Sequence, residues 1–320
     1  MEVKELKLKN IILPSNVLMA PMAGYTSFPF RILMRELGAG LCFNEMVNSN
    51  ALKYNDRATK KLLFTNSMEK IKAAQLIGSD PKIMGEIAQS DYLRAYDIID
   101  INMGCPVPNI FKSGAGSALL SDLKRASKII KECRKSGKII TVKTRVGLKE
   151  DNLIAAEFAK MCEDSGADMI TIHGRTRNMM YSGTPFYDEI EKAKSVVKIP
   201  VIANGGINSV EDAENVMKKT SADGIMIARY ALFNPFIFSQ LTNKEIKKDK
   251  YAIMLNQLDL ASLHYDETFT IFYIKRLSSH FMRGLKGVKK YKEDLYRCGN
   301  VLELREVIKK IFYKEEDHDN

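Results

Sequence analysis

The sequence lacks the features that mark membrane and secreted proteins. No stretch approaches the ~20 consecutive apolar residues that a membrane-spanning helix needs, and residues 1–5 contain no apolar segment of a secretory signal. The five cysteines are odd in number, widely spaced and free of any Cys-x-x-Cys pair, which argues against a disulfide framework and against a zinc site. We therefore expect a cytoplasmic protein with no membrane contact and no bound metal.

The composition predicts a large folded protein with a basic surface. A length of 320 residues and a hydrophobic content of 45% indicate one large domain, or a domain plus an appendage. The formal charge of +10 favours a polyanionic partner, although a lysine-rich proteome would give the same total. The charge is concentrated between residues 275 and 297, where Glu293 and Asp294 oppose eight basic residues: Lys275, Arg276, Arg283, Lys286, Lys289, Lys290, Lys292 and Arg297. We interpret this segment as a phosphate-binding surface.

Short apolar runs alternate with amphipathic segments from residue 17 to about residue 240, a pattern typical of repeated β/α units. Eight strands are predicted at residues 17–20, 41–44, 72–76, 98–102, 139–143, 169–173, 201–204 and 224–228. Helices are predicted between them, for example at residues 121–135, 152–164 and 209–219. Eight such units predict an α/β fold, a (β/α)8 TIM barrel. A doubly wound open sheet is the alternative, but it more often has fewer strands.

The pattern changes beyond residue 241. Residues 242–250 are polar and charged and indicate a linker, whereas residues 251–313 carry helical periodicity without a strand signal. We therefore predict a barrel domain at residues 1–243 and a small all-helical domain at residues 244–320, with a solvated tail at residues 314–320.

The strand at residues 98–102 ends in the most informative segment, Asn102-Met103-Gly104-Cys105-Pro106. In β/α folds, side chains just past the strand ends carry out the chemistry. A cysteine there can donate a proton or act as a nucleophile. The alternative is a buried cysteine that behaves as a small hydrophobe. Most of the other strands also end in hydrogen-bonding or glycine residues, and together these strand ends form a ring that favours a functional site. The residues of the ring are Pro21, Met22, Ala23, Gln75, Asn102, Lys143, Arg145, His173, Arg175, Arg177, Asn204, Gly205, Gly206, Ala228 and Arg229.

The chemistry of this ring indicates flavin mononucleotide. The Gly205-Gly206 turn and the backbone around Arg229 suit a phosphate group. Gln75, Lys143 and His173 can hydrogen-bond the edge of a planar heterocycle, and Lys143 would stabilise negative charge on it. No Gly-x-Gly-x-x-Gly follows a strand, so a resident dinucleotide is disfavoured.

Several motifs, in order on successive strands, resemble those of the bacterial tRNA-dihydrouridine synthases, most closely the B-type subfamily. They are Ala20-Pro21-Met22-Ala23-Gly24, Glu45-Met46, Gln75-Leu76-Ile77-Gly78, Asn102-Met103-Gly104-Cys105-Pro106, Lys143-Thr144-Arg145-Val146-Gly147, His173-Gly174-Arg175-Thr176-Arg177 and Asn204-Gly205-Gly206-Ile207. The resemblance implies an FMN-binding barrel, a helical domain that grips tRNA, and NADPH-dependent reduction of particular uridines to 5,6-dihydrouridine.

The resemblance also implies roles for individual residues. Cys105 would be the proton donor, and Asn102 would orient the uracil. The FMN contacts it implies are Pro21, Met22, Ala23, Gln75, Lys143 and His173, with the phosphate on Asn204, Gly205, Gly206, Ala228 and Arg229. The RNA contacts expected are Arg145, Arg175, Arg177, Arg276, Lys286, Lys289 and Lys290.

Three positions depart from the family pattern. Ala228 replaces a glycine, Met179 replaces a glutamine, and the Trp-Tyr pair expected shortly after His280 is absent from a chain without tryptophan.

Two rival functions stay open. One is a dihydroorotate dehydrogenase-like FMN enzyme for a small pyrimidine, which the basic C-terminal segment disfavours. The other is a non-catalytic tRNA-binding protein, which the intact ring disfavours. We expect a monomer.

Overall fold

The computed structural model describes residues 2–283, 285 and 287–313. Its main feature is a parallel sheet whose strands follow the order β4-β3-β13-β12-β11-β8-β7-β6-β5. The strands are β3 (Val17–Met19), β4 (Leu41–Cys42), β5 (Val47–Asn48), β6 (Ala73–Ile77), β7 (Ile98–Met103), β8 (Ile139–Arg145), β11 (Met169–His173), β12 (Val201–Asn204) and β13 (Gly224–Ile227).

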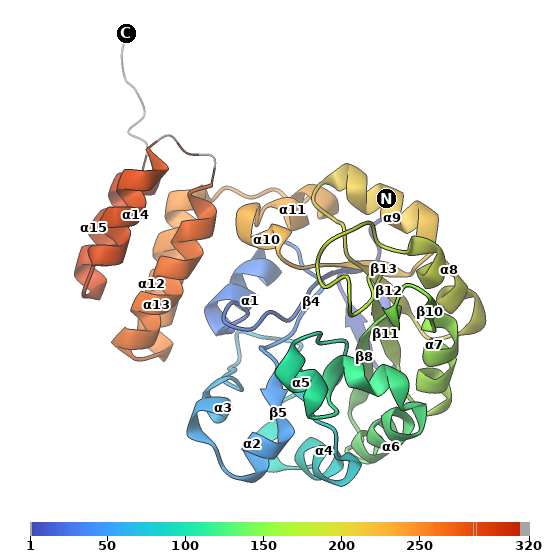
Figure 1. The fold of residues 1–320 in the computed structure, drawn as a ribbon. Helices are drawn as coiled ribbons and strands as arrows, with labels where there is room; N and C mark the ends of the chain where they lie inside the picture. The colour runs from blue at the N-terminus through green and yellow to red at the C-terminus, as the bar shows by residue number, and fades with distance from the viewer. Residues whose placement is uncertain (1, 284, 286, 314–320) are drawn as a thin grey trace.

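The sheet closes into a barrel because Phe43, directly after β4, forms a parallel bridge with Ala73 of β6. The second barrel strand is thus divided into β4 and β5, and β5 pairs with the far end of β6. The predicted (β/α)8 barrel is confirmed, and the open-sheet alternative is wrong (Figure 1).

The register of the sheet brings the polar strand ends to one level. Asn102 of β7 pairs with Lys143 of β8. His173 of β11 pairs with Arg145 of β8 on one side and with Asn204 of β12 on the other. Because neighbouring parallel strands end together, these side chains gather at the carboxyl end of the barrel.

Helices surround the barrel, with α4, α6, α7, α8 and α9 on its outside (Figure 1). Aspartates cap two of them, since Asp80 accepts from backbone N–H groups at the start of α4 and Asp122 does so at the start of α6. The helices of the barrel are α1 (Phe28–Glu36), α2 (Ser49–Lys53), α3 (Arg57–Lys61), α4 (Pro81–Ala88), α5 (Pro108–Lys112), α6 (Leu123–Arg134), α7 (Ala155–Asp164), α8 (Tyr187–Val196), α9 (Val210–Thr220), α10 (Tyr230–Phe233) and α11 (Ile237–Thr242), with 3₁₀ turns at Asp91–Leu93 and Gly116–Ser121.

Two small hairpins were not predicted. The helix expected at residues 152–164 begins only at Ala155, because β10 (Asn152–Leu153) pairs with β9 (Gly147–Lys149). The other hairpin joins β1 (Leu6–Leu8) to β2 (Ile11–Leu13). Its leucines form one apolar cluster with residues at the starts of the barrel strands, such as Ile98 and Ile139. This hairpin therefore covers the end of the barrel opposite the polar strand ends.

Within the described residues, four helices follow the barrel: α12 (Lys250–His264), α13 (Glu267–Phe281), α14 (Val288–Arg297) and α15 (Val301–Phe312). They stand beside the barrel and meet it where α12 packs on α1 and α13 packs on α10 (Figure 1). Buried hydrogen bonds join the two parts, since Gln257 Nε2 donates to the Pro29 carbonyl at 3.0 Å. Across the described residues, no helix combines the length and the apolarity needed to cross a membrane.

Candidate active site

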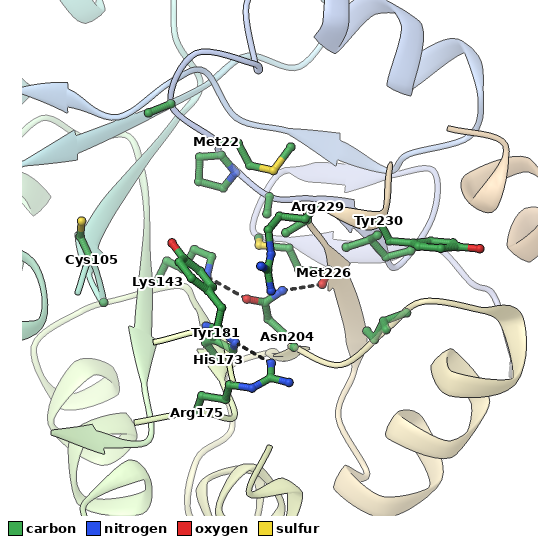
Figure 2. Close-up of a pocket in the computed structure, with 18 of the residues that line it drawn as sticks. Met22, Cys105, Lys143, His173, Arg175, Tyr181, Asn204, Met226, Arg229 and Tyr230 are labelled. Atoms are coloured by element: carbon green, nitrogen blue, oxygen red, sulfur yellow. Dashed lines mark hydrogen bonds between the residues drawn. The ribbon is translucent and has the colours of Figure 1, made fainter. Parts of the chain in front are cut away.

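A cavity of about 470 Å³ opens at the carboxyl ends of the barrel strands. Figure 2 shows Cys105 on the β7 side of this cavity and Arg229 with Tyr230 on the β13 side. The predicted site residues in its wall are Pro21, Met22, Ala23, Gln75, Asn102, Cys105, Lys143, Arg145, His173, Arg175, Asn204, Gly205, Gly206, Ala228 and Arg229. The structure therefore brings every predicted cofactor residue to one pocket, of a size typical for a bound cofactor.

Asn102 shapes the loop that carries Cys105. Its side-chain oxygen accepts the backbone N–H groups of Gly104 at 3.1 Å and of Cys105 at 2.9 Å. Its amide nitrogen donates to Gln75 Oε1 at 2.9 Å. Burial raises the pKa of the Cys105 thiol, so the thiol keeps its proton at neutral pH. A protonated thiol in a cavity wall can serve as an acid.

A cluster of basic side chains lines the cavity next to this loop, on β8 and β11. Lys143 Nζ donates to Asn204 Oδ1 at 3.0 Å, and burial, with a smaller contribution from the Arg145 guanidinium, lowers the pKa of Lys143 to about 8. Burial also lowers the pKa of Arg145 to about 10 and, with nearby cations, holds the pKa of His173 well below its usual range. Each shift reflects unfavourable burial of positive charge, so an anion bound here would be stabilised.

The turn after β12 requires glycine. Gly205 and Gly206 have φ angles of +108° and +76°, a region that side chains disfavour. A Cβ atom on Gly205 would lie 2.6 Å from His173 Cδ2, and one on Gly206 would meet the Tyr187 hydroxyl. The turn therefore leaves backbone open to the pocket at a place where any side chain would block it.

Arg145 and Arg175 hold loops at the rim of the pocket. Arg145 Nε donates to the Gly104 carbonyl at 2.9 Å, next to Cys105, and its Nη1 donates to two carbonyls of the loop after β11. Arg175 Nε donates to carbonyls of the same loop. Their predicted RNA contacts remain predictions, whereas their contacts within the protein fix the rim.

Two other arginines predicted to bind RNA lie outside the pocket wall. The Arg177 guanidinium lies 3.9 Å from the centre of the Phe111 ring on α5. Arg276 of α13 donates to the Gly24 carbonyl at 2.5 Å and lies over the Tyr25 ring. Lys289 and Lys290 belong to α14, and Lys286 lies outside the described residues.

Arg276 is part of a contact between the helices and the barrel that sequence reasoning missed. The Gly24 N–H donates to Glu45 Oε2, so Gly24 is held through both its amide and its carbonyl. Tyr25 and His280 of α13 are linked side chain to side chain at 3.0 Å. We call Gly24, Tyr25, Glu45, Arg276 and His280 the interdomain joint. Gly24 and Glu45 lie in motifs noted above, but nothing in the sequence pairs them with Arg276 and His280 of α13.

Tyr181 was also missed. Its ring, in the loop after β11, lies 4.4 Å from the Arg229 guanidinium carbon and 5.6 Å from that of Arg145 (Figure 2). It therefore bridges the mouth of the pocket between β8 and the segment after β13. The loop has no periodicity and no charge pattern, so nothing in the sequence sets this tyrosine apart.

A parallel barrel with a thiol, a basic wall and a glycine turn at its carboxyl end defines an enzyme. Comparison with known proteins shows its family. The dihydrouridine synthase family model matches residues 18–320. A probable tRNA-dihydrouridine synthase of Rickettsia conorii is 38% identical over 265 residues, covering 82% of this chain and 80% of the relative. The tRNA-dihydrouridine synthase B of Pseudomonas aeruginosa is 33% identical over 295 residues, 89% of each chain. The chain belongs to the dihydrouridine synthase family.

Solved structures support the fold. A 2-naphthoyl-CoA reductase aligns with a TM-score of 0.60 at 12% identity, covering 75% of this chain and 52% of its own. An old yellow enzyme homologue of Zymomonas mobilis aligns with a TM-score of 0.53 at 12% identity, covering 77% of this chain and 93% of its own. At these identities the likeness shows a common barrel fold.

Proposed function

We propose that this protein uses bound FMN and NADPH to reduce particular uridines of tRNA to 5,6-dihydrouridine. Family membership gives the reaction class. The observation that carries the proposal is a protonated thiol, Cys105, that shares one pocket with a basic wall formed by Lys143, Arg145 and His173. A tRNA-binding scaffold without catalysis would not need this arrangement.

The residues present fit FMN. The Gly205-Gly206 turn is a cradle that a Cβ atom would fill, and Arg229 faces the same cavity, so a phosphate can be held there by backbone and guanidinium. Lys143 supplies a positive charge at the edge of a planar ring, and the neutral His173 ring can hydrogen-bond to the same edge. The remaining proposed ring contacts are Pro21, Met22, Ala23 and Gln75, and the remaining phosphate contacts are Asn204, Gly206 and Ala228.

The reaction needs two groups at opposite carbons of the uracil C5=C6 bond. FMN, when bound and reduced by NADPH, would supply a hydride to C6. The Cys105 thiol then gives its proton to C5, and the raised pKa of this thiol keeps the proton available. Asn102 orients the uracil edge. A uridine in folded tRNA must be turned out into the pocket, at an unstacking cost of a few kcal/mol.

The RNA is held mainly through phosphates and shape. Lys289 and Lys290 of α14 are the proposed phosphate contacts on the helices, together with Lys286. Arg145, Arg175, Arg177 and Arg276 also make contacts within the protein, so any RNA contact they form adds to a structural role. We further propose a monomer in the cytoplasm, with a helical RNA-binding domain that begins near residue 244.

The decisive experiment adds the purified protein and NADPH to unmodified tRNA under anaerobic conditions and measures dihydrouridine by mass spectrometry of the digested RNA. Dihydrouridine should appear in tRNA, and parallel reactions with orotate and dihydroorotate should show no turnover. Turnover of the free pyrimidines would favour the dihydroorotate dehydrogenase-like alternative. Binding of tRNA without NADPH oxidation would favour a scaffold, and either result would overturn the proposal.

A further inference from the structure

Asp100 is a buried carboxylate to which the reaction above assigns no role. It lies on β7, two residues before Asn102, and only 1% of its surface is exposed. Two side chains hydrogen-bond to it. Thr141 Oγ1 donates to Asp100 Oδ1 at 2.6 Å, and Gln75 Nε2 donates to Asp100 Oδ2 at 2.7 Å.

These bonds continue to the loop that carries Cys105. Gln75 Oε1 accepts from Asn102 Nδ2 at 2.9 Å, and Asn102 Oδ1 accepts from the backbone N–H of Cys105 at 2.9 Å. An unbroken chain of hydrogen bonds therefore runs from Asp100 through Gln75 and Asn102 to Cys105. Both of the intermediate side chains line the cavity.

The direction of every bond in this series is fixed at the Cys105 end. A backbone N–H only donates, so Asn102 must turn its oxygen to Cys105 and its amide nitrogen to Gln75. Gln75 must then present its oxygen to Asn102 and its nitrogen to Asp100. Asp100 Oδ2 accepts that bond in either protonation state, because a proton on the carboxyl group can reside on Oδ1. A side chain without an acceptor at position 100 would leave the Gln75 amide held by its bond from Asn102 alone, with its nitrogen unpartnered.

We propose that Asp100 is a positioning residue: its carboxylate orients the Gln75 and Asn102 amides, and so presents an N–H of Gln75 to the cofactor ring and holds the loop of Cys105. The inference rests on the proposed function for its consequences in catalysis. The amide orientation itself follows from the described bonds alone. Gln75 lines the cavity, and the second N–H of its amide, which Asp100 does not accept, would serve as a donor to an acceptor on the ring, such as a carbonyl oxygen.

Two other accounts of Asp100 make different predictions. If Asp100 serves only as a counter-charge for the basic wall, its negative charge is the essential property. If it serves only the packing of the barrel interior, any loss of a hydrogen bond to it should have the same effect. Orientation of Gln75 instead requires an acceptor at one particular place, whether or not that acceptor is charged.

Three variants separate these accounts. Asp100→Asn removes the charge but can still accept from Gln75, because the Thr141 hydroxyl can rotate to accept from the new amide. Asp100→Leu has a similar size and no acceptor. Thr141→Val is the matched control, since it removes one hydrogen bond from the same carboxylate and leaves the bond from Gln75 intact.

Two measurements that do not depend on turnover report on Gln75 and on the loop of Cys105, respectively. The first is the FMN dissociation constant, measured by quenching of flavin fluorescence. The second is the rate at which iodoacetamide alkylates Cys105, followed by mass spectrometry of its peptide. Asp100→Leu should weaken FMN binding by up to about 10-fold, as expected when one neutral hydrogen bond to the ligand is lost, and Cys105 should be alkylated several-fold faster. Asp100→Asn and Thr141→Val should stay within about threefold of wild type in both readouts, and melting temperatures report folding in each case.

The proposal fails if Asp100→Asn is as impaired as Asp100→Leu, which would support the counter-charge account. It also fails if Thr141→Val matches Asp100→Leu, which would support the packing account. Should Asp100→Leu not fold, Asp100→Asn decides: a change of more than about tenfold in either readout would overturn the proposal, and a change within threefold supports it. Absence of dihydrouridine with the wild-type enzyme would overturn the proposed function, while the alkylation rates would still test the orientation of Asn102.

Discussion

Replacing Lys143 by methionine should stabilise the cofactor-free protein while weakening its cofactor binding. Burial and the Arg145 guanidinium lower the pKa of Lys143 from 10.5 to about 8. That difference corresponds to roughly 3 kcal/mol of unfavourable free energy for keeping the ammonium charged at neutral pH. The hydrogen bond to Asn204 Oδ1 that would be lost contributes about 1 kcal/mol. Lys143→Met should therefore raise the free energy of unfolding at pH 7 by about 2 kcal/mol.

The pH dependence gives the sign of this effect independently. Between the folded pKa of about 8 and the unfolded value near 10.5, the unfolded wild-type chain binds more protons than the folded one. The wild-type stability from this group therefore rises with pH, by about 2 kcal/mol between pH 7 and pH 9.5. Methionine does not titrate, so the advantage of Lys143→Met should shrink to near zero at pH 9.5.

Urea unfolding of both cofactor-free proteins at pH 7 and pH 9.5 measures this difference, and other titrating groups cancel in the comparison. FMN titrations of the same samples should show weaker binding by Lys143→Met, since the anionic ligand loses a cation. An equal or lower stability of Lys143→Met at pH 7, or an advantage that persists at pH 9.5, would refute the reasoning that Lys143 is held in the pocket wall at an energetic cost.

Three further predictions concern other parts of the site. With Cys105→Ala, NADPH should still bleach the flavin, whereas re-oxidation by unmodified tRNA in stopped flow should slow by about 10²–10⁴-fold; an unchanged second step would remove this thiol from the reaction. Gly205→Ala should lower FMN affinity and melting temperature together, because the added Cβ meets His173 at 2.6 Å and the backbone has φ of +108°; unaltered FMN titrations would contradict the phosphate turn. The pair Lys289→Gln and Lys290→Gln should weaken tRNA binding and reduce its salt dependence in filter-binding assays, and an unchanged salt slope would place the RNA contacts elsewhere.

The sequence was sufficient to predict the barrel and the ring of residues in its pocket. Apolar runs ending in polar residues locate the strands, and the closure of a parallel barrel brings all their ends together. For that reason Gln75, Lys143 and Asn204 could be assigned to one pocket from widely separated segments. The contacts that these residues make with FMN stay predictions.

Features that depend on contacts between loops could not be predicted. The hairpin of β1 and β2 turns at Lys9, which has φ of +53°, where neither glycine nor a turn motif marks the position. The position of Tyr181 at the mouth of the pocket depends on its contacts with Arg145 and Arg229, which come from distant segments of the sequence. The basic segment at residues 275–297 was noted for its charge, but periodicity alone did not show that Arg276 faces the barrel.

The interdomain joint determines the angle between the helical region and the barrel that holds the pocket. Gly24 is held through its amide by Glu45 and through its carbonyl by Arg276, directly after the proposed FMN contacts at residues 21–23. α13 has 15 residues and so spans about 22 Å. A rotation of about 10° at the joint would displace the far end of such a helix by about 4 Å, more than the length of a hydrogen bond. The joint thus fixes the angle of the helical region relative to the pocket, and we expect a small change at Gly24 to change which nucleotide of a bound tRNA reaches the pocket.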